Sequence, residues 1–245
     1  MTGSTVARFP FDDRGGLVVL VDPGRVTPAV AGELAGRAAE GGACGFLVGD
    51  SLGLGGHLAP HVEAIRTEAP GLPVVQFPAS ASDLSADVDA VLFLVLLSGR
   101  DPRYLVEEQV RATDFFDRHP EVTAVSTAYL LVDGGRRSSV EAVTGTEPLP
   151  ADASVVSAHV KAGRLIGMRA TYLEAGSGAT RAVPPAVVAA ARQASHAPLF
   201  VGGGVRSVAA ARALREAGAD YVVVGTLFER EPSTAVRSLA LAARA

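Results

Sequence analysis

The sequence predicts an α/β fold, a (β/α)8 TIM barrel with a shortened third crossover. Eight short apolar runs alternate with segments of mostly helical periodicity, as a parallel sheet with helical crossovers requires. The length of 245 residues is close to the roughly 250 residues that such barrels take. Glycine turns follow the last three predicted strands, where barrels often bind phosphate. An open doubly wound sheet is the alternative. We expect one domain over residues 1–245.

The first four strands are predicted from continuous apolar runs, which suit strands that are buried on both faces. We expect strands at residues 16–22, 45–49, 72–77 and 89–94, and helices at 27–41, 60–69 and 102–118. Pro102 lies near the start of the last of these helices, and Pro120 follows its end. Only residues 81–88 join the third strand to the fourth, so a helix of more than two turns does not fit there.

The second half repeats the alternation. Strands are expected at residues 127–132, 167–173, 198–201 and 221–224, and helices at 151–163, 182–195, 208–217 and 232–243. Ser207 is a plausible N-cap, and Gly163 and Gly218 are expected to stop their helices. After the turn at residues 133–135, we expect a small additional strand at 138–143.

Composition excludes several classes of function. The net charge of −4 and pI of about 5.7 give no basic surface for nucleic acid. Cys44 is the only cysteine, so no intrachain disulfide can form, and we expect a buried, inert thiol. The N-terminal residues do not resemble a signal peptide, and no apolar run approaches the roughly 20 residues of a membrane span. A soluble, cytoplasmic protein is expected.

Three glycine segments near the end of the chain predict an anion site. Gly203-Gly204 and Gly225-Thr226 each follow an apolar strand and precede a helix, where backbone amides and the helix dipole favour negative charge. The third segment follows the sixth strand and contains Ser177 and Gly178, which can offer a hydroxyl group and a backbone amide. We expect phosphate at these six residues. The alternative is that the glycines only serve the turns.

Tyr172 and Glu174 are two residues apart on the sixth predicted strand, so their side chains point to the same side. Glu174 is the candidate general base, because its carboxylate could take a proton from a substrate hydroxyl near the phosphate. Tyr172 could hold the same polyol. A structural salt bridge is the alternative role for Glu174.

Further candidates follow the first, second and fourth strands, at the end of the barrel where catalytic residues emerge. Asp22 could bind Mg2+, with Ser51 or Asp50 as a second ligand and phosphate oxygens completing the shell. Arg100 could bind a second phosphate group. The alternatives are that Asp22 caps its turn before Pro23 and that Arg100 is a solvated surface residue.

Residues 172–179, Tyr-Leu-Glu-Ala-Gly-Ser-Gly-Ala, resemble the signature of geranylgeranylglyceryl phosphate synthases and bacterial heptaprenylglyceryl phosphate synthases. The similarity covers nearly the whole chain and includes Asp22-Pro23 and residues 48–53, 202–207 and 225–229. It implies a Mg2+-dependent prenyltransferase that uses a prenyl diphosphate. The glycine segments would bind a phosphorylated three-carbon acceptor, and Asp22 and Ser51 would hold Mg2+ on the diphosphate.

The resemblance also implies an apolar groove for the prenyl chain, which the short third crossover would leave open. Leu94, Val95 and Tyr104 are candidates to line it, with core packing as the alternative for each. Relatives are often dimers, so we expect a homodimer, with transient membrane contact for product release. Departures from the family pattern, such as Asp50 in place of glycine and Gly24 after Asp22-Pro23, lie on the diphosphate and prenyl side.

The acceptor stays open at this point. The chain also resembles the relatives of moenomycin-type biosynthesis, which attach a farnesyl group to 3-phosphoglycerate, so glycerol 1-phosphate and 3-phosphoglycerate are both candidates. For the latter, Arg169 or Arg206 would meet the carboxylate. The other readings are a sugar-phosphate isomerase or lyase on the same barrel, and a non-catalytic prenyl-phosphate binder.

Overall fold

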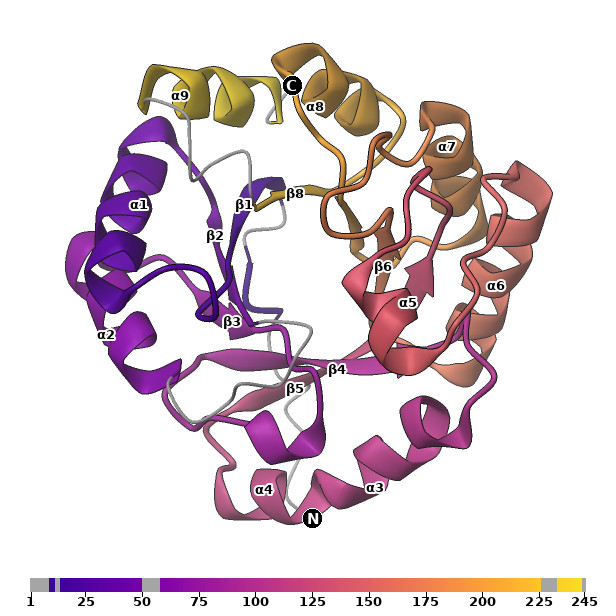
Figure 1. The fold of residues 1–245 in the computed structure, drawn as a ribbon, viewed down its shortest axis with the longest axis horizontal. Coiled ribbons are helices and arrows are strands. Elements are labelled where there is room, and N and C mark those ends of the chain that lie inside the picture. Colours follow the sequence, from indigo (N-terminus) through magenta and orange to yellow (C-terminus); the bar gives the residue numbers. More distant parts are fainter. Residues whose placement is uncertain (1–8, 12–13, 50–57, 226–232, 244–245) are drawn as a thin grey trace.

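A computed structural model describes residues 9–11, 14–49, 58–225 and 233–243. Eight parallel strands close into a barrel in chain order, and β1 pairs with β8, which confirms the predicted TIM barrel (Figure 1). The strands are β1 (Gly16–Val21), β2 (Gly45–Val48), β3 (Val74–Gln76), β4 (Ala90–Leu96), β5 (Thr123–Leu131), β6 (Ala170–Glu174), β7 (Leu199–Gly202) and β8 (Tyr221–Val224).

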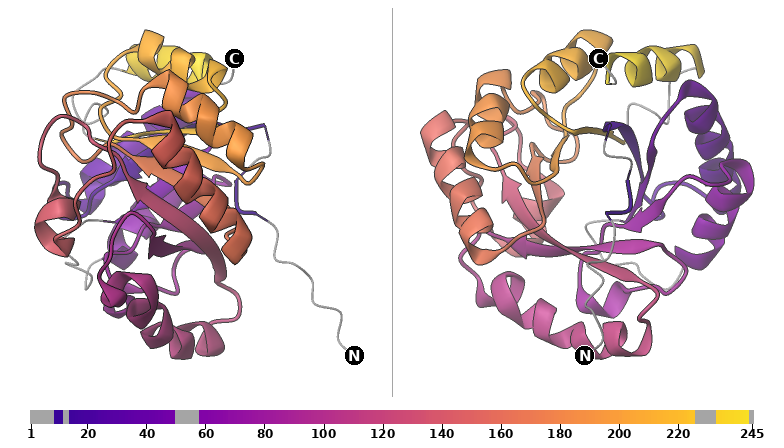
Figure 2. Two further views of the ribbon diagram at one scale, coloured as in Figure 1. Left: turned by 90° about the vertical axis from the view of Figure 1, so that its right-hand side faces the viewer. Right: turned by 180° about the vertical axis from the view of Figure 1, so that it is seen from behind.

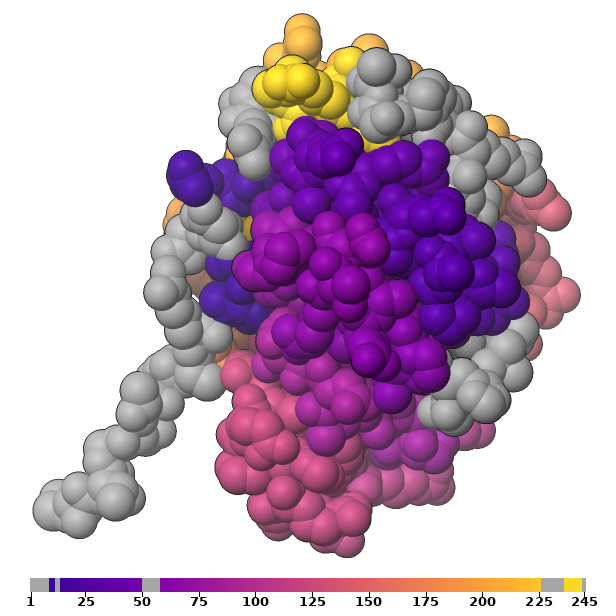
Figure 3. All heavy atoms as spheres, turned by 90° about the vertical axis from the view of Figure 1, so that its left-hand side faces the viewer, coloured from indigo at the N-terminus to yellow at the C-terminus, as the bar shows by residue number. Residues whose placement is uncertain are grey.

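Helices surround the barrel in both views of Figure 2. They are α1 (Pro28–Gly41), α2 (Leu58–Glu68), α3 (Glu108–Arg111), α4 (Thr113–Arg118), α5 (Ser139–Thr144), α6 (Ala153–Ile166), α7 (Pro185–Ala194), α8 (Val208–Glu216) and α9 (Ser233–Ala242). Side chains cap several of them, including Ser207 on α8 as predicted, whose Oγ accepts a hydrogen bond from the Ala210 amide. Figure 3 shows the outer face made by α1 and α2, with α9 above them.

The third crossover is short, as the sequence predicts. Between β3 and β4 there is only one 3-10 turn, η1 (Ala81–Asp83). The following helix is also irregular. Instead of one helix over residues 102–118, the chain forms a π-helical turn, η2 (Arg103–Glu107), and then α3 and α4. This side of the barrel therefore lacks a regular covering helix, and a groove opens there.

The small strand predicted at residues 138–143 is wrong, because this segment is the helix α5. Ser138 Oγ accepts a hydrogen bond from the Glu141 amide at 3.2 Å, and Glu141 Oε2 accepts one from the Ser138 amide at 2.6 Å. Gly145, in the left-handed region at φ 65°, ends the helix. This capping box and glycine cap outweigh the strand preference of the two valines in the segment.

Gly163 does not end α6, which continues to Ile166 and is capped by Gly167 at φ 95°. A Cβ atom on Gly163 would lie 2.9 Å from the Cβ of Ala128, so glycine is needed here for close packing of α6 on β5. β5 itself begins at Thr123, earlier than predicted, because it pairs with β4 from that residue onward.

Aromatic rings fill the amino end of the barrel. Phe11 and Phe9 lie over the first residues of the strands, with ring centroids 5.3 Å and 5.9 Å from that of Tyr221. Phe200 packs on Tyr221 at 4.5 Å. The open end is therefore the carboxyl end. No helix in the described ranges is long and apolar enough to cross a bilayer.

Candidate active site at the carboxyl end of the barrel

A cavity of about 420 Å³ lies at the carboxyl ends of β6, β7 and β8. It brings together most of the residues that the sequence predicts for the acceptor. The predicted residues that line it are Tyr172, Glu174, Ser177, Gly178, Gly203, Gly204 and Gly225. Thr226 and Ser51, which were also predicted, lie outside the described residues. Residues that are far apart in the sequence thus share one cavity.

Glu174 is the last residue of β6 and is 6% exposed. Its Oε1 accepts a hydrogen bond from the Gly176 amide at 2.6 Å. Burial raises the pKa of the carboxyl group to about 7, although the Gly176 amide opposes the shift. No described residue forms an ion pair with Glu174, so its carboxylate can exchange a proton near neutral pH.

Tyr172 is fully buried, and its interaction with Glu174 lowers the pKa of that carboxyl group. Burial and then the nearby Glu174 carboxylate raise the pKa of Tyr172 well above its usual value, so the hydroxyl stays protonated. A Cβ atom on Gly202 would lie 2.5 Å from the Tyr172 hydroxyl oxygen, so β7 must carry glycine there. Tyr172 and Glu174 therefore form a coupled polar pair in the wall of the cavity.

The glycine loops come close to Glu174 because they have no side chains. Gly203 has φ 77°, and a Cβ atom on it would lie 2.4 Å from Glu174 Oε1. Gly204 and Gly178 also have positive φ, at 68° and 73°. Gly225 differs, since a Cβ atom there would meet Leu20 only at ordinary contact distance. The predicted phosphate loops thus meet in space, and phosphate binding itself stays a prediction.

Asp22 follows β1, and it is held by its own turn. Its Oδ1 accepts a hydrogen bond from the Gly24 amide at 2.9 Å, and its Oδ2 pairs with Arg25 Nε at 3.0 Å. These contacts match the turn-capping alternative. The side chain is still 25% exposed at the carboxyl end of the barrel. A single carboxylate fits Mg2+, which binds through one or two carboxylates together with substrate phosphates. Metal binding by Asp22 stays a prediction.

Arg100 follows β4, and its guanidinium folds back on its own turn. Nη1 donates a hydrogen bond to the Gly99 carbonyl at 2.6 Å, and the side chain does not line the cavity. Diphosphate binding by Arg100 stays a prediction and requires this side chain to turn. Arg169 does not line the cavity, contrary to the suggestion, because its Nη1 donates a hydrogen bond to the Ala124 carbonyl near the amino end of β5. Arg206 lines the cavity and donates to the Ala179 carbonyl at 2.7 Å.

An apolar groove adjoins the acceptor cavity at the irregular side of the barrel. It holds about 110 Å³ between β4, η1, the η2–α3 segment and α5. Leu94 and Tyr104 line it as predicted, whereas Val95 does not. The residues common to both cavities are Phe77, Tyr129 and Val140. The two cavities are therefore adjacent and share these three residues as a common wall.

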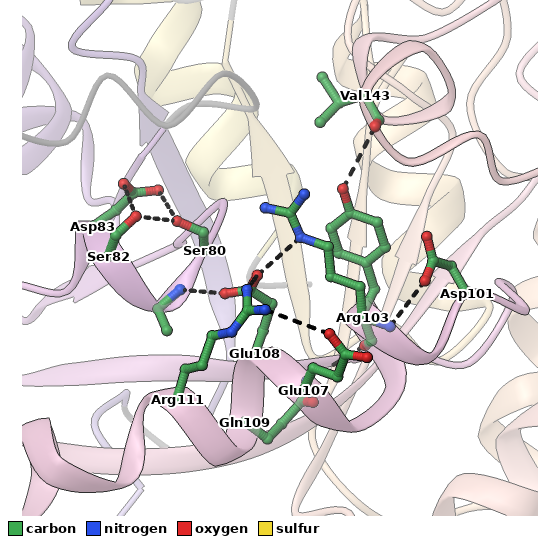
Figure 4. Close-up of polar contacts among 12 residues, drawn as sticks. Ser80, Ser82, Asp83, Asp101, Arg103, Glu107, Glu108, Gln109, Arg111 and Val143 are labelled. Carbon is green, nitrogen blue, oxygen red and sulfur yellow. Dashed lines mark hydrogen bonds and ion pairs between the residues drawn. The ribbon is translucent and has the colours of Figure 1, made fainter.

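A polar clamp holds the outer wall of the groove (Figure 4). Glu108 Oε2 accepts a hydrogen bond from the Ala81 amide at 2.8 Å, which ties η1 to α3. Glu108 Oε1 pairs with Arg103 Nε and Arg111 Nη1, each at 3.0 Å. Burial alone would raise the pKa of Glu108, but these donors outweigh it and lower the pKa. Sequence reasoning missed Glu108, because the charges of residues 107–111 are typical of an exposed helix.

A model of the PcrB family matches residues 12–243. The chain belongs to the PcrB family. The geranylgeranylglyceryl phosphate synthase of Thermococcus kodakarensis is 37% identical over 216 residues, which cover 88% of this chain and 84% of that protein. The enzyme of the same name from Aeropyrum pernix is 40% identical over 221 residues, covering 87% and 85%.

Solved structures agree with this PcrB family assignment. The (S)-3-O-geranylgeranylglyceryl phosphate synthase of Thermoplasma acidophilum, in complex with sn-glycerol-1-phosphate, superposes with a TM-score of 0.88 and 30% identity. The match covers 94% of this chain and 93% of that one. These relatives confirm the enzyme class predicted from the sequence, a prenyltransferase.

Proposed function

We propose that this PcrB family member transfers a polyprenyl group from an allylic prenyl diphosphate to a hydroxyl group of a phosphorylated three-carbon acceptor. One observation carries the proposal. The buried carboxyl group of Glu174 lies in a cavity with the glycine loops, and an apolar groove adjoins this cavity. A phosphorylated polyol and an apolar chain can therefore meet beside a titratable group. The product is an ether-linked lipid precursor.

In the proposed reaction, backbone amides of the glycine loops hold the acceptor phosphate, and the hydroxyl of Tyr172 holds the polyol. The prenyl chain lies in the groove, with its first carbon at the junction of the cavities. The bond between that carbon and the diphosphate oxygen breaks, and its electron pair leaves with the diphosphate. The acceptor oxygen then bonds to the carbon, and Glu174 takes the hydroxyl proton.

Mg2+ is the proposed cofactor. Asp22 and Ser51 would hold it, and it would supply positive charge that stabilises the leaving diphosphate. Arg100 would add to that charge once its side chain turns from the carbonyl of Gly99. We further propose that residues 1–245 form a single prenyltransferase domain, that the protein is a homodimer, and that it touches a membrane transiently when product leaves.

Glycerol 1-phosphate is the favoured acceptor. The support comes from the relatives named as geranylgeranylglyceryl phosphate synthases and from the solved structure in complex with sn-glycerol-1-phosphate. Among the described residues that line the cavity, Arg206 is the cation that would suit an additional carboxylate, as in 3-phosphoglycerate. It already donates a hydrogen bond to the Ala179 carbonyl, which makes it less free to bind a second anion.

The test is a set of incubations read by product mass. Purified protein with Mg2+ and farnesyl or geranylgeranyl diphosphate is given either glycerol 1-phosphate or 3-phosphoglycerate. We expect an ether product with glycerol 1-phosphate, and none when Mg2+ is replaced by a chelator. A product only with 3-phosphoglycerate would reverse the choice of acceptor. If the protein consumes neither the prenyl diphosphate nor the acceptor, with prenyl chains from farnesyl to heptaprenyl, prenyl transfer is refuted.

A further inference from the structure

Three aromatic rings meet where the acceptor cavity borders the apolar groove. Phe77 follows β3, Tyr129 lies on β5 and Tyr172 lies on β6. The ring centroid of Phe77 is 5.7 Å from that of Tyr129 and 5.2 Å from that of Tyr172, and the two tyrosine rings are 5.6 Å apart. Phe77 and Tyr129 line both cavities, and Tyr172 lines the acceptor cavity. We call these three residues the junction rings.

The barrel fixes the junction rings in place. Tyr129 and Tyr172 are register partners on the neighbouring parallel strands β5 and β6, so both side chains point to the same side of the sheet, into the barrel. Below them, the ring of Phe200 is stacked on that of Tyr172, at 5.9 Å between centroids and 3° between planes. The strand pairing and these ring contacts hold the junction rings in place.

The charged groups around the junction are few. Among the described residues that line either cavity, the ionisable side chains besides the tyrosines are Glu174, Glu108 and Arg206. Glu108 is already paired with two arginines in the clamp, and Arg206 donates to the Ala179 carbonyl. A positive charge on a carbon atom at the junction would thus face mainly aromatic π systems, which attract cations.

We propose that the junction rings stabilise the positive charge that develops on the allylic carbons, with Phe77 and Tyr129 as catalytic residues. This inference rests on the proposed prenyl transfer. When the carbon–oxygen bond to the diphosphate breaks, its electron pair leaves with the diphosphate, and positive charge spreads over the allylic carbons. The rings face this charge until the acceptor oxygen bonds to the first carbon and Glu174 takes the proton. The rings exchange no proton or electron.

Burial raises the pKa of Tyr129 well above its usual value, and the Glu174 carboxylate adds to the shift. The phenol therefore stays neutral during the reaction. Its hydroxyl group could still act by hydrogen bonding to a substrate, which is a different role from that of the ring. Substitution by phenylalanine separates the two roles, because it removes the hydroxyl group and keeps the ring.

The first experiment compares single-turnover rates of Phe77→Leu, Tyr129→Leu and Tyr129→Phe with the wild type. Loss of one ring should slow prenyl transfer by about threefold to thirtyfold, the range that a cation–π contact supports. Tyr129→Phe should stay within about threefold of the wild type. Phe116→Leu is the matched control, since Phe116 packs on Phe93 and Phe115 and lines neither cavity. It should leave the rate unchanged.

The second experiment measures binding and needs no turnover. The probes are an ammonium analogue of the prenyl donor, with nitrogen in place of an allylic carbon, and its neutral carbon isostere, each with inorganic diphosphate. The wild type should bind the ammonium analogue more tightly than the neutral isostere. In the leucine variants, the ratio of the two affinities should fall by about tenfold. Tyr129→Phe and Phe116→Leu should keep it.

Two outcomes would overturn the proposal. Equal losses of affinity for the charged and the neutral probe in the leucine variants would assign the rings a packing role only. A Tyr129→Phe variant as slow as Tyr129→Leu would assign the effect to the hydroxyl group. If the wild type transfers no prenyl group to any acceptor, the proposed function fails, and the preference for the ammonium probe still reports whether the rings bind a cation.

Discussion

At the scale of single residues, Glu174 links burial to chemistry. A carboxyl group with a pKa of about 7 is half ionised at neutral pH, whereas an exposed glutamate is fully ionised there. The same burial that removes water also places the carboxyl group against the Gly176 amide and the Gly203 backbone. Two measurable consequences follow, one for catalysis and one for stability.

The first consequence is a pH dependence of prenyl transfer. If the ionised carboxylate takes the hydroxyl proton, the kcat/KM for the acceptor should rise with pH up to about 7 and level off above it. Glu174→Gln should lower this parameter by about 10²–10⁴-fold and remove the dependence. Glu147→Gln is the control, because Glu147 is exposed and lines neither cavity. A wild-type profile that is flat from pH 5 to 9 would argue against Glu174 as the base.

The second consequence concerns the free energy of unfolding. The pKa of Glu174 is higher in the folded protein than its ordinary value of 4.5, so the folded state favours the protonated form. The contribution of Glu174 is full below about pH 4.5 and is lost as pH rises through about 7. Glu174→Gln should therefore stabilise the protein at pH 8 by up to about 3 kcal/mol, and much less at pH 4. Urea unfolding at both pH values measures the difference.

At the scale of elements, α5 positions the loop that follows β6. A Cβ atom on Gly176 would lie 2.6 Å from the Cβ of Ser138, so the cap of α5 and the predicted phosphate loop are in direct contact. Val140, on the same helix, lines both cavities. Figures 1 and 2 show α5 over the carboxyl ends of the strands. The capping box thus supports the loop that follows β6 as well as stabilising α5.

Loss of this cap should weaken acceptor binding. Ser138→Ala removes the acceptor of the Glu141 amide and should cost about 1 kcal/mol of stability. It should also raise the KM for the acceptor, because the loop loses its support. Asp152→Ala is the matched control, since Asp152 caps α6 through the Ser154 and Val155 amides and lines neither cavity. Equal changes of KM in both variants would mean that the cap has no specific role in the site.

The elements also show what the sequence could predict and what it could not. The strands and most helices can be predicted, because apolar periodicity and caps such as Ser207 are local signals. The single helix expected at residues 102–118 is wrong. Gly163 was misread because the reason for glycine there is Ala128 on another element. Tyr129 was missed for the same reason, since its partners Phe77 and Tyr172 are distant in the sequence. The irregular η2–α4 segment depends on such contacts too.

At the scale of the whole molecule, the barrel separates stability from function along its axis. Aromatic packing closes the amino end, and the cavities occupy the carboxyl end. The glycine loops that follow the late strands predict the site at the carboxyl end. The sequence did not predict the plug of Phe9 and Phe11, because those residues lie before the first strand in a segment without periodicity.

This division predicts a stability effect without a kinetic one. Phe11 is 3% exposed, and Phe11→Ala should destabilise the barrel by about 3–5 kcal/mol. The KM values of both substrates should stay unchanged at a temperature where the variant remains folded. Leu165→Ala serves as the control, because Leu165 is 79% exposed and its loss should change the midpoint of thermal unfolding little. A raised KM in Phe11→Ala would show that the two ends are coupled.

The adjacency of the two cavities has a kinetic consequence for the proposed reaction. The proposed ether carries the phosphate end of one substrate and the chain of the other, so it occupies both cavities at once. The product makes the contacts of both substrates with the protein, but its binding costs the translational and rotational entropy of only one molecule. Such a product dissociates slowly and inhibits its own synthesis as it accumulates. Release of the lipid product should therefore limit the turnover rate. Detergent micelles or vesicles, which take up the lipid, should raise that rate.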